Sequence, residues 1–209
     1  MRRCLLIVTC ASLLALPALA LGDNTTITVA PNDSLTFGPS KAKQTVGAGA
    51  IHWQWGTTGT TFAAHNVRQD DKLFYSGKPT SSKPKGFDVV PSAGSFHYYC
   101  ELHGSRHSGM QGTIEVKPAI VNQTAKSFVV QWSPGTDDTG NAFDVRYRVD
   151  GGKWTSWKKH TTKAQATFGA KRKPLRVRAG HAYDVEARSE SKSDTKERSS
   201  WSPPAKVQT

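Results

Sequence analysis

The sequence predicts an all-β protein made of two β-sandwich domains. Short strand-like runs, separated by Gly, Pro, Ser and Asp, fill the chain after its first twenty residues. No stretch repeats apolar residues at helical spacing over three turns. The chain has 209 residues, more than one average small domain, so the order of the strands must show how many cores it forms.

Eight strand-like runs precede residue 118. One of them shows the alternation most clearly, because Ile51, Trp53 and Trp55 fall on one face and His52 and Gln54 on the other. This period is expected for a sheet of a two-layer sandwich with an aromatic and aliphatic interior. The expected strands are Thr25–Ala30, Ser34–Phe37, Gln44–Val46, Ala50–Trp55, Ala64–Val67, Gly86–Val90, Gly94–Cys100 and Gly112–Val116.

A second series of strands begins directly after Lys117-Pro118, so we expect residues 21–117 and 118–209 to form two domains with little freedom between them. Seven or eight strands in about 92 residues is the size of an immunoglobulin-like sandwich. The expected strands are Ala119–Asn122, Ser127–Trp132, Phe143–Val149, Trp154–His160, Ala164–Phe168, Leu175–Arg178, Ala182–Ser189 and Ala205–Gln208.

The first twenty residues are typical of an export signal. Arg2 and Arg3 supply positive charge, residues 5–16 form an apolar run too short to span a bilayer, and residues 18–20 form a small-x-small cleavage site. We therefore expect residues 1–20 to be a signal peptide, and the mature protein to be secreted, periplasmic or extracellular. No later run supplies the roughly 20 apolar residues of a transmembrane segment.

The positive charge of the chain lies mostly in its second half. Residues 21–117 contain nine Lys and Arg against seven Asp and Glu, whereas residues 118–209 contain seventeen against nine. Clusters such as Lys158-Lys159, Lys171-Arg172-Lys173 and the pair Arg176 and Arg178 suit an anionic cell-wall polymer or an acidic partner protein, or are simply a solvated surface. Nucleic acid is the least favoured partner, because no stacking aromatics accompany these charges.

The mature chain would keep one cysteine, Cys100, since Cys4 and Cys10 leave with the signal. A lone thiol in an oxidising compartment serves as an intermolecular disulfide, a nucleophile, an inert buried group or a metal ligand. Cys100, His103 and Met110 fall in one hairpin, where we expect a strand to end at Cys100 and the next to start after Met110. Two imidazoles, a thiolate and a weak axial thioether form an electron-transfer copper site.

The first half resembles the plastocyanin, halocyanin and amicyanin group of cupredoxins, which fold as Greek-key sandwiches. The motifs that carry this resemblance span residues 24–117 and are Ile51-His52-Trp53-Gln54-Trp55, His65-Asn66-Val67, Phe74-Tyr75-Ser76-Gly77, Tyr99-Cys100-x-x-His103-Gly104 and Gly109-Met110-x-Gly112-x-Ile114-x-Val116. The resemblance implies one type 1 copper ion bound by His65, Cys100, His103 and Met110. It also implies that Asn66 hydrogen-bonds the loop around Cys100 and so fixes the thiolate.

The chain departs from this family in the loop between the second histidine and the methionine. Six residues separate His103 from Met110, where close relatives commonly have four, and the insertion contains Arg106 and His107. His107 is therefore an alternative to His103 as the second imidazole, and Met110 could lie farther from the metal. We favour His103, because Cys-x-x-His-Gly matches the family pattern.

The second half resembles a fibronectin type III domain more loosely. The segments that carry this likeness are Ser127–Trp132, Val145–Arg148, Leu175, Gly180–Ala187 and Ser200–Pro204. Trp132 is the expected core tryptophan, and Tyr183 is a candidate tyrosine corner whose hydroxyl bonds back to the main chain. Trp154 and Trp157 have opposite strand parities, so we expect at least one of them to be exposed.

These observations predict a one-electron carrier that cycles between Cu(I) and Cu(II) and docks on a redox partner protein. It would not be an enzyme, because the His-x-His motifs of copper oxidases and reductases are missing. The alternatives are a copper sequestration or delivery protein and a cell-surface binding module with structural copper. His52 and His97 point away from the ligands by strand parity, and His160 and His181 belong to the other domain.

Overall fold

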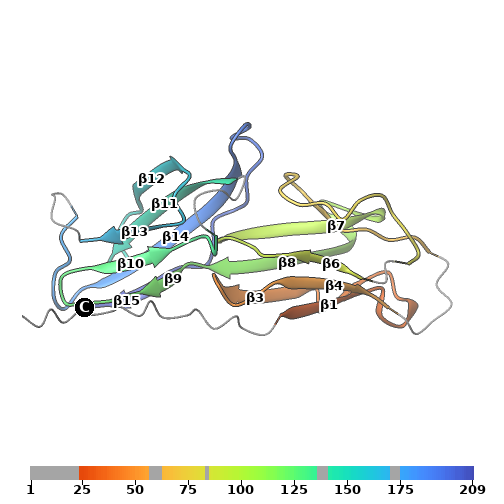
Figure 1. The fold of residues 1–209 in the computed structure, drawn as a ribbon, viewed down its shortest axis with the longest axis horizontal. Helices are drawn as coiled ribbons and strands as arrows, with labels where there is room; N and C mark the ends of the chain where they lie inside the picture. Colours follow the sequence, from red (N-terminus) through yellow and green to blue (C-terminus); the bar gives the residue numbers. More distant parts are fainter. Residues whose placement is uncertain (1–23, 57–62, 83–84, 136–140, 170–174) are drawn as a thin grey trace, which may run out of the picture.

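The computed structural model describes residues 24–56, 63–82, 85–135, 141–169 and 175–209, whose strands and loops form two groups of sheets (Figure 1). Within these ranges there is no α-helix, and the one helical element is the 3₁₀ turn η1 (Pro31–Asp33). The prediction of an all-β protein is confirmed. Residues 1–20 and the basic cluster at 171–173 lie outside the described residues.

Two four-stranded sheets form the first half of the molecule. The first sheet has the order β2-β1-β4-β6, with β1 (Thr25–Val29), β2 (Phe37–Gly38), β4 (Ile51–Trp55) and β6 (Phe87–Val89). The second has the order β3-β8-β7-β5, with β3 (Lys41–Thr45), β5 (Arg68–Gln69), β7 (Gly94–Ser105) and β8 (Ser108–Lys117). β1 runs parallel to β4 and β3 parallel to β8, and the other pairs are antiparallel.

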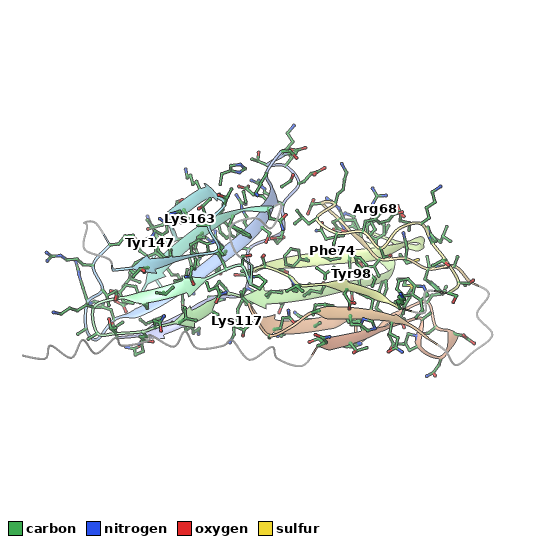
Figure 2. The ribbon with its side chains drawn as sticks, in the orientation of Figure 1. Arg68, Phe74, Tyr98, Lys117, Tyr147 and Lys163 are labelled. Atoms are coloured by element: carbon green, nitrogen blue, oxygen red, sulfur yellow. The ribbon has the colours of Figure 1, made fainter. Side chains whose placement is uncertain are left out.

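The core between these sheets follows from the alternation of side chains along the strands. On β4, Trp53 is fully buried, and its ring meets Phe74 at 5.5 Å and Tyr98 at 5.3 Å between centroids. On β7, the buried side chains include Phe96, Tyr98 and Cys100, which share one face of the strand. Figure 2 labels Phe74 and Tyr98 in this half of the molecule. Cys100 therefore lies at the end of a row of buried aromatic residues.

The second half of the molecule contains a three-stranded and a four-stranded sheet. The three-stranded sheet has the order β13-β10-β9, with β9 (Ala119–Val121), β10 (Phe128–Gln131) and β13 (Gln165–Phe168). The four-stranded sheet has the order β12-β11-β14-β15, with β11 (Asn141–Val149), β12 (Thr155–Thr161), β14 (Ala182–Ser191) and β15 (Ala205–Gln208).

The two core residues expected in this half are both buried. Trp132 is fully buried, and its indole N–H donates to the Lys163 carbonyl at 2.6 Å. The Tyr183 hydroxyl accepts from the Arg178 backbone N–H at 2.8 Å and donates to the Arg176 carbonyl at 3.5 Å. The hydrogen bond from a tyrosine hydroxyl to the nearby main chain is therefore confirmed.

The expectation that Trp154 or Trp157 would be exposed is wrong, because both are half-buried. Trp157 packs edge-on against Trp132, with ring centroids 5.8 Å apart. Trp154 is covered by the guanidinium groups of Arg146 and Arg148, at 4.6 and 4.7 Å from its ring. Strand parity places Trp154 on the outer face, but cation–π stacking covers it there.

Other differences concern strand boundaries. Leu175–Arg178 is not a strand, and the segment 64–67 forms only an isolated bridge at His65. The expected strand Ser34–Phe37 is reduced to the two residues of β2, and β3 begins at Lys41. These segments carry short or mixed side-chain patterns, which specify pairing weakly.

The two halves meet through buried hydrogen bonds. The Ala93 N–H donates to the Trp132 carbonyl at 2.7 Å, and Ser189 Oγ donates to the Ala93 carbonyl at 3.0 Å. Ser95 on β7 forms a two-way backbone pair with Ser200, at 3.0 and 3.1 Å. β8 ends at Lys117 and β9 begins at Ala119, so a single residue joins the two series of strands.

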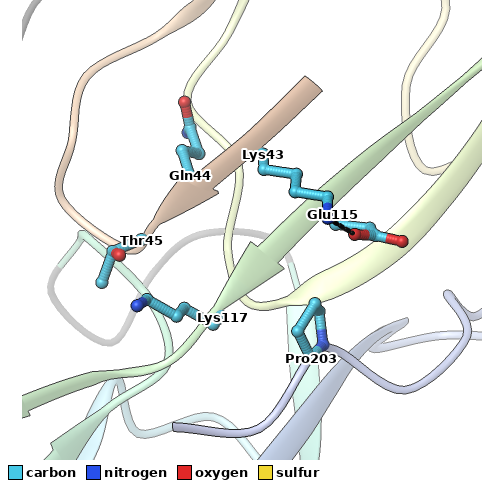
Figure 3. Close-up of a pocket in the computed structure, with 6 residues that line it drawn as sticks. All are labelled: Lys43, Gln44, Thr45, Glu115, Lys117 and Pro203. Atoms are coloured by element: carbon cyan, nitrogen blue, oxygen red, sulfur yellow. Dashed lines mark ion pairs between the residues drawn. The ribbon is translucent and has the colours of Figure 1, made fainter. Parts of the chain in front are cut away.

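A cleft of about 300 Å³ lies beside this junction (Figure 3). The residues that line it are Lys43, Gln44, Thr45, Glu115, Lys117 and Pro203. Glu115 pairs with Lys43 at 3.6 Å and with Lys41 at 2.7 Å. In the part of the chain that the structure describes, no helix has the length and apolar character needed to cross a membrane.

Candidate metal centre

Two chain segments bring the donor groups of the candidate site together. Cys100 and His103 both lie on β7, within the stretch where its pairing with β8 is interrupted. His65 lies on a separate segment that is held by an isolated bridge, in which His65 and Thr80 exchange two backbone hydrogen bonds of 2.9 Å. The backbone therefore fixes His65 without a long strand around it.

The hairpin that carries the ligands is longer than expected. We expected a loop between Cys100 and Met110, but β7 continues to Ser105 and β8 starts at Ser108. The pairing register is interrupted between Tyr99 and Gly104 and then resumes. The six residues between His103 and Met110 explain this, because they are enough to pair Gly104 with Gly109 and leave a tight turn at the tip.

Glycine is required on both sides of this extended hairpin. A Cβ atom on Gly104 would collide with the backbone of Met110, and one on Gly109 would collide with the His103 carbonyl. Gly109 also has a φ of 75°, in the left-handed region that favours glycine. The backbones of β7 and β8 therefore approach each other closely next to His103.

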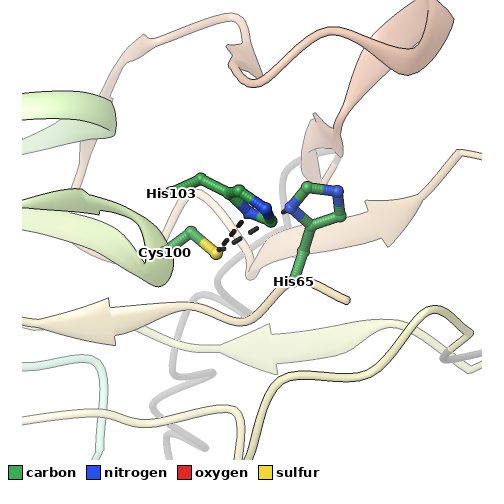
Figure 4. A group of neighbouring side chains, drawn as sticks. All are labelled: His65, Cys100 and His103. Atoms are coloured by element: carbon green, nitrogen blue, oxygen red, sulfur yellow. Dashed lines mark hydrogen bonds between the residues drawn. The ribbon is translucent and has the colours of Figure 1, made fainter. Parts of the chain in front are cut away.

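The three donor atoms converge on one point (Figure 4). Cys100 Sγ lies 3.5 Å from His103 Nδ1 and 3.8 Å from His65 Nδ1, and all three donors lie within 4.8 Å of one another. Cys100 and His65 are buried, with 0% and 2% of their surface exposed, and His103 is half-buried. The cluster is thus closed on the protein side and reaches the surface at His103.

These distances fit ligands of one metal ion. With a metal–sulfur bond near 2.3 Å and metal–nitrogen bonds near 2.0–2.1 Å, a sulfur and a nitrogen on the same ion lie about 3.6–3.8 Å apart. Burial and the neighbouring His103 lower the pKa of His65, so that its ring stays neutral with a lone pair to offer. The donor set of two imidazoles and one thiol can therefore hold a metal ion.

Met110 lies on β8, the strand that pairs with the strand carrying Cys100 and His103. It is fully buried, and its backbone contacts Gly104, the residue that follows His103. The Met110 backbone therefore lies close to the segment that carries His103. Its role as a fourth ligand stays a prediction.

His107 lies outside the cluster. It occupies the exposed turn at the tip of the hairpin, where its backbone N–H donates to Ser105 Oγ at 3.4 Å. The neighbouring Arg106 is held against the turn directly after β5 by ion pairs with Asp70 and Asp71, at 3.2 and 2.9 Å. The inserted residues therefore turn away from Cys100, and the geometry favours His103 as the second imidazole.

The remaining histidines among the described residues each have a carboxylate partner instead. His52 bonds Asp88 at 2.6 Å, and His97 bonds Asp70 at 2.9 Å and Gln111 at 2.8 Å. In the second half, His160 bonds Glu190 and His181 bonds Asp150. None of these groups belongs to the His65–Cys100–His103 cluster.

Asn66 makes the hydrogen bond that the sequence analysis expects of it. Its side-chain oxygen accepts from the Glu101 backbone N–H at 2.9 Å, and its amide nitrogen donates to the Gly77 carbonyl at 3.0 Å. The bond to Glu101 is to the residue directly after Cys100. The Asn66 side chain, one residue after His65, is therefore hydrogen-bonded to the backbone one residue after Cys100.

Sequence reasoning missed the Glu101 side chain. Its carboxylate accepts hydrogen bonds from Asn66, Tyr75 and the guanidinium of Arg68. Partial burial opposes ionisation of Glu101, but the donors Arg68, Asn66 and Tyr75 outweigh it and lower the pKa of the carboxyl. The available signal was Tyr75 within the Phe74-Tyr75-Ser76-Gly77 motif, but the sequence does not show that Tyr75 faces Glu101.

Comparison with known proteins adds little to this geometry. No protein-family model and no curated protein matches the chain. Among solved structures, a chain titled "Myokine structure" is 17% identical to this one with a TM-score of 0.32, and the match covers 44% of this chain and 90% of that chain. At that identity and TM-score the match says nothing about the metal cluster.

Proposed function

We propose that the protein is a mononuclear type 1 copper protein of the cupredoxin class that carries single electrons. The observation that supports this is the convergence of two imidazole Nδ1 atoms and the Cys100 sulfur within 4.8 Å, in a largely buried place. Copper would be held by His65, Cys100 and His103, with Met110 as the fourth ligand. A bound copper ion supplies one-electron chemistry, for which this soft and borderline donor set is suited.

The residues of the chain would contribute a preformed geometry. The donors of His65, Cys100 and His103 face one another on a packed backbone, so little side-chain movement would accompany a change of charge at the site. Burial of Cys100 and His65 excludes water on the inner side. His103 and the exposed Leu102 would form the outer side, where a redox partner could approach.

This proposal includes an extracytoplasmic location and a role in electron transfer, in which no covalent bond is made or broken. Residues 1–20 would direct export, and the unpaired Cys100 would be protected from oxidation by its burial and by the metal. The second half would be a fibronectin type III-like domain that positions the carrier. Its excess of Lys and Arg would attract an acidic protein or an anionic wall polymer.

The direct test is to add Cu(II) to the purified protein and record its visible spectrum. We expect one equivalent of copper to produce an intense thiolate-to-copper absorption band, and Cys100→Ser to abolish it. A wild-type protein that binds copper without such a band, or a Cys100→Ser variant that keeps it, would exclude thiolate ligation. Reversible one-electron reduction, followed in the same band, separates a carrier from a site that only stores copper.

A further inference from the structure

The carboxylate of Glu101 joins the two chain segments that carry the donor groups. It accepts hydrogen bonds from Asn66 Nδ2 at 2.6 Å, from the Tyr75 hydroxyl at 2.9 Å and from the Arg68 guanidinium. An ionised carboxylate has about four acceptor positions, so three donors nearly fill it. The side chain is only 24% exposed, which protects these bonds from competing water.

The acceptor Glu101 and one of its donors, Asn66, lie next to the proposed metal ligands in sequence. Glu101 directly follows Cys100, and Asn66 directly follows His65. Asn66 also accepts from the Glu101 backbone N–H at 2.9 Å, so the two residues bond each other in both directions. A displacement of either segment would therefore strain contacts one residue away from Sγ or from the imidazole.

Regular strand pairing is interrupted around Cys100. β7 pairs regularly with β8 up to Tyr99 and again from Gly104, but the register is interrupted in between. On its other edge, β7 pairs with β5 at Tyr98 and Tyr99. Cys100 and His103 thus lie in the irregular stretch of the strand, where side-chain hydrogen bonds replace part of the ladder.

Glu115 on β8 offers a contrast within the same sheet. Its side chain is 20% exposed, close to the 24% of Glu101, and it also accepts from cationic partners. Those partners, Lys41 and Lys43, have long side chains that are 54% and 69% exposed, and pairs of this kind contribute little to structure. Glu101 instead accepts hydrogen bonds from an amide, a guanidinium and a phenol, those of Asn66, Arg68 and Tyr75, which all lie in one short segment.

We propose that Glu101 is a positioning residue of the metal centre, which holds the His65 segment against the Cys100 strand before any metal binds. This inference rests on the proposed function for its consequence at the metal, but not for the contact itself. Arg68, Asn66 and Tyr75 are the groups through which Glu101 acts. None of them needs to touch the metal.

The first test uses metal-free protein and compares Glu101→Gln with the matched control Glu115→Gln. We expect amide hydrogen exchange in residues 63–69 and 99–104 to become at least tenfold faster in Glu101→Gln, because the new amide group presents a donor where three donors converge. Exchange in Glu115→Gln should stay as in the wild type in these segments. Unchanged protection in Glu101→Gln would overturn the proposal.

The second test measures Cu(I) affinity by competition with a chromophoric chelator. Removing partners of this kind typically costs 10–100-fold in metal affinity, and we expect that loss for Glu101→Gln and a smaller loss for Tyr75→Phe, which deletes one of the three bonds. Tyr75 is 46% exposed, so its variant keeps the test open if Glu101→Gln does not fold. If Glu101→Gln lost Cu(I) affinity while its amide exchange stayed as in the wild type, the charge of Glu101 and not its positioning role would explain the loss.

The two proposals fail in different ways. If the wild-type protein gave no thiolate-to-copper band, the proposed function would fail, and the exchange comparison in metal-free protein would still decide the role of Glu101. If the band were present and both Glu101→Gln and Tyr75→Phe bound Cu(I) like the wild type, the positioning role would fail alone.

Discussion

At the scale of single residues, the site depends on which imidazole completes the donor set. His103 Nδ1 is 3.5 Å from Cys100 Sγ, whereas His107 is exposed on the turn. The sequence favours His103 by its Cys-x-x-His-Gly pattern but leaves His107 as an alternative, because both follow Cys100 within seven residues. The decisive fact is the register of the hairpin, which turns the tip away from the sulfur.

Substitution of the two histidines gives a direct prediction. His103→Ala should abolish the thiolate-to-copper band or shift it strongly, since one of the three close donors is lost, whereas His107→Ala should leave it nearly intact. Visible absorption after addition of one equivalent of Cu(II) is the measurement. Loss of colour in His107→Ala, with His103→Ala unaffected, would reverse the assignment.

A second residue-level prediction concerns acid stability. Burial of Asp144 disfavours its charge, but the ion pair with Arg188 at 2.6 Å and the His160 backbone N–H outweigh burial and lower the pKa of this carboxyl below its ordinary value of 3.8. A lowered folded-state pKa stabilises the fold above the unfolded-state pKa, and this contribution disappears as the pH falls through the folded-state value.

Asp144→Asn should therefore destabilise the protein at pH 7 and make the loss of stability below about pH 4 shallower. The measurement is the free energy of unfolding in urea between pH 2.5 and 7. Asp88→Asn, at a mostly exposed carboxylate, is the control and should change the curve little. An Asp144→Asn curve parallel to that of the wild type would contradict the lowered pKa.

At the scale of elements, the β7–β8 hairpin determines the geometry of the site. Its interrupted register between Tyr99 and Gly104 frees Cys100 and His103 from regular pairing, and its resumed register fixes the tip. Met110 reaches the buried side of β8 directly after this tip. The hairpin is thus both an ordinary element of the sheet and the support for three of the four proposed ligands.

Gly104→Ala tests this role. Its added Cβ meets the backbone N, C and O of Met110, which cannot move away as a flexible side chain would, so we expect a loss of about 1–3 kcal/mol in unfolding free energy and a weakened copper band. Gly180→Ala is the control, because that Cβ meets nothing within 4 Å and costs only the strain of its φ of 79°. Its copper band should match the wild type, and an unchanged band in Gly104→Ala would contradict the proposed coupling.

At the scale of the whole molecule, the two halves share buried hydrogen bonds as well as a chain junction. One contact pairs Ser95, near the start of β7, with Ser200 of the second half. β7 is also the strand that carries Cys100. The buried Ser189 hydroxyl reaches across to Ala93, and Lys72 pairs with Glu197 at the surface. These two cross-half contacts differ sharply in burial.

Their contributions should differ accordingly. Ser189→Ala leaves the fully buried Ala93 carbonyl without that donor and should cost about 1–3 kcal/mol in urea unfolding. Lys72→Ala removes an ion pair whose lysine is 65% exposed and should change stability by less than about 1 kcal/mol. Equal effects of the two changes would show that the buried contact does not hold the halves together.

The sequence by itself determined the class of fold and most of the core. The alternation of Ile51, Trp53 and Trp55 and the apolar runs around Trp132 specify buried faces, because a strand points successive side chains to opposite sides. It also singled out His65, Cys100, His103 and Met110 as a ligand set. These inferences depend on local pattern and on residue chemistry, both of which can be read along the chain.

Only the tertiary structure showed that His107 lies outside the donor cluster, that Trp154 and Trp157 are both half-buried, and that Glu101 lies between the two donor segments. Each of these depends on contacts between residues that are not neighbours in the chain, such as Asn66 with Glu101 or Arg146 with Trp154. The register of a hairpin and the stacking of side chains across strands depend on the whole packed sheet. A local sequence pattern contains no information about which distant segment will lie against it.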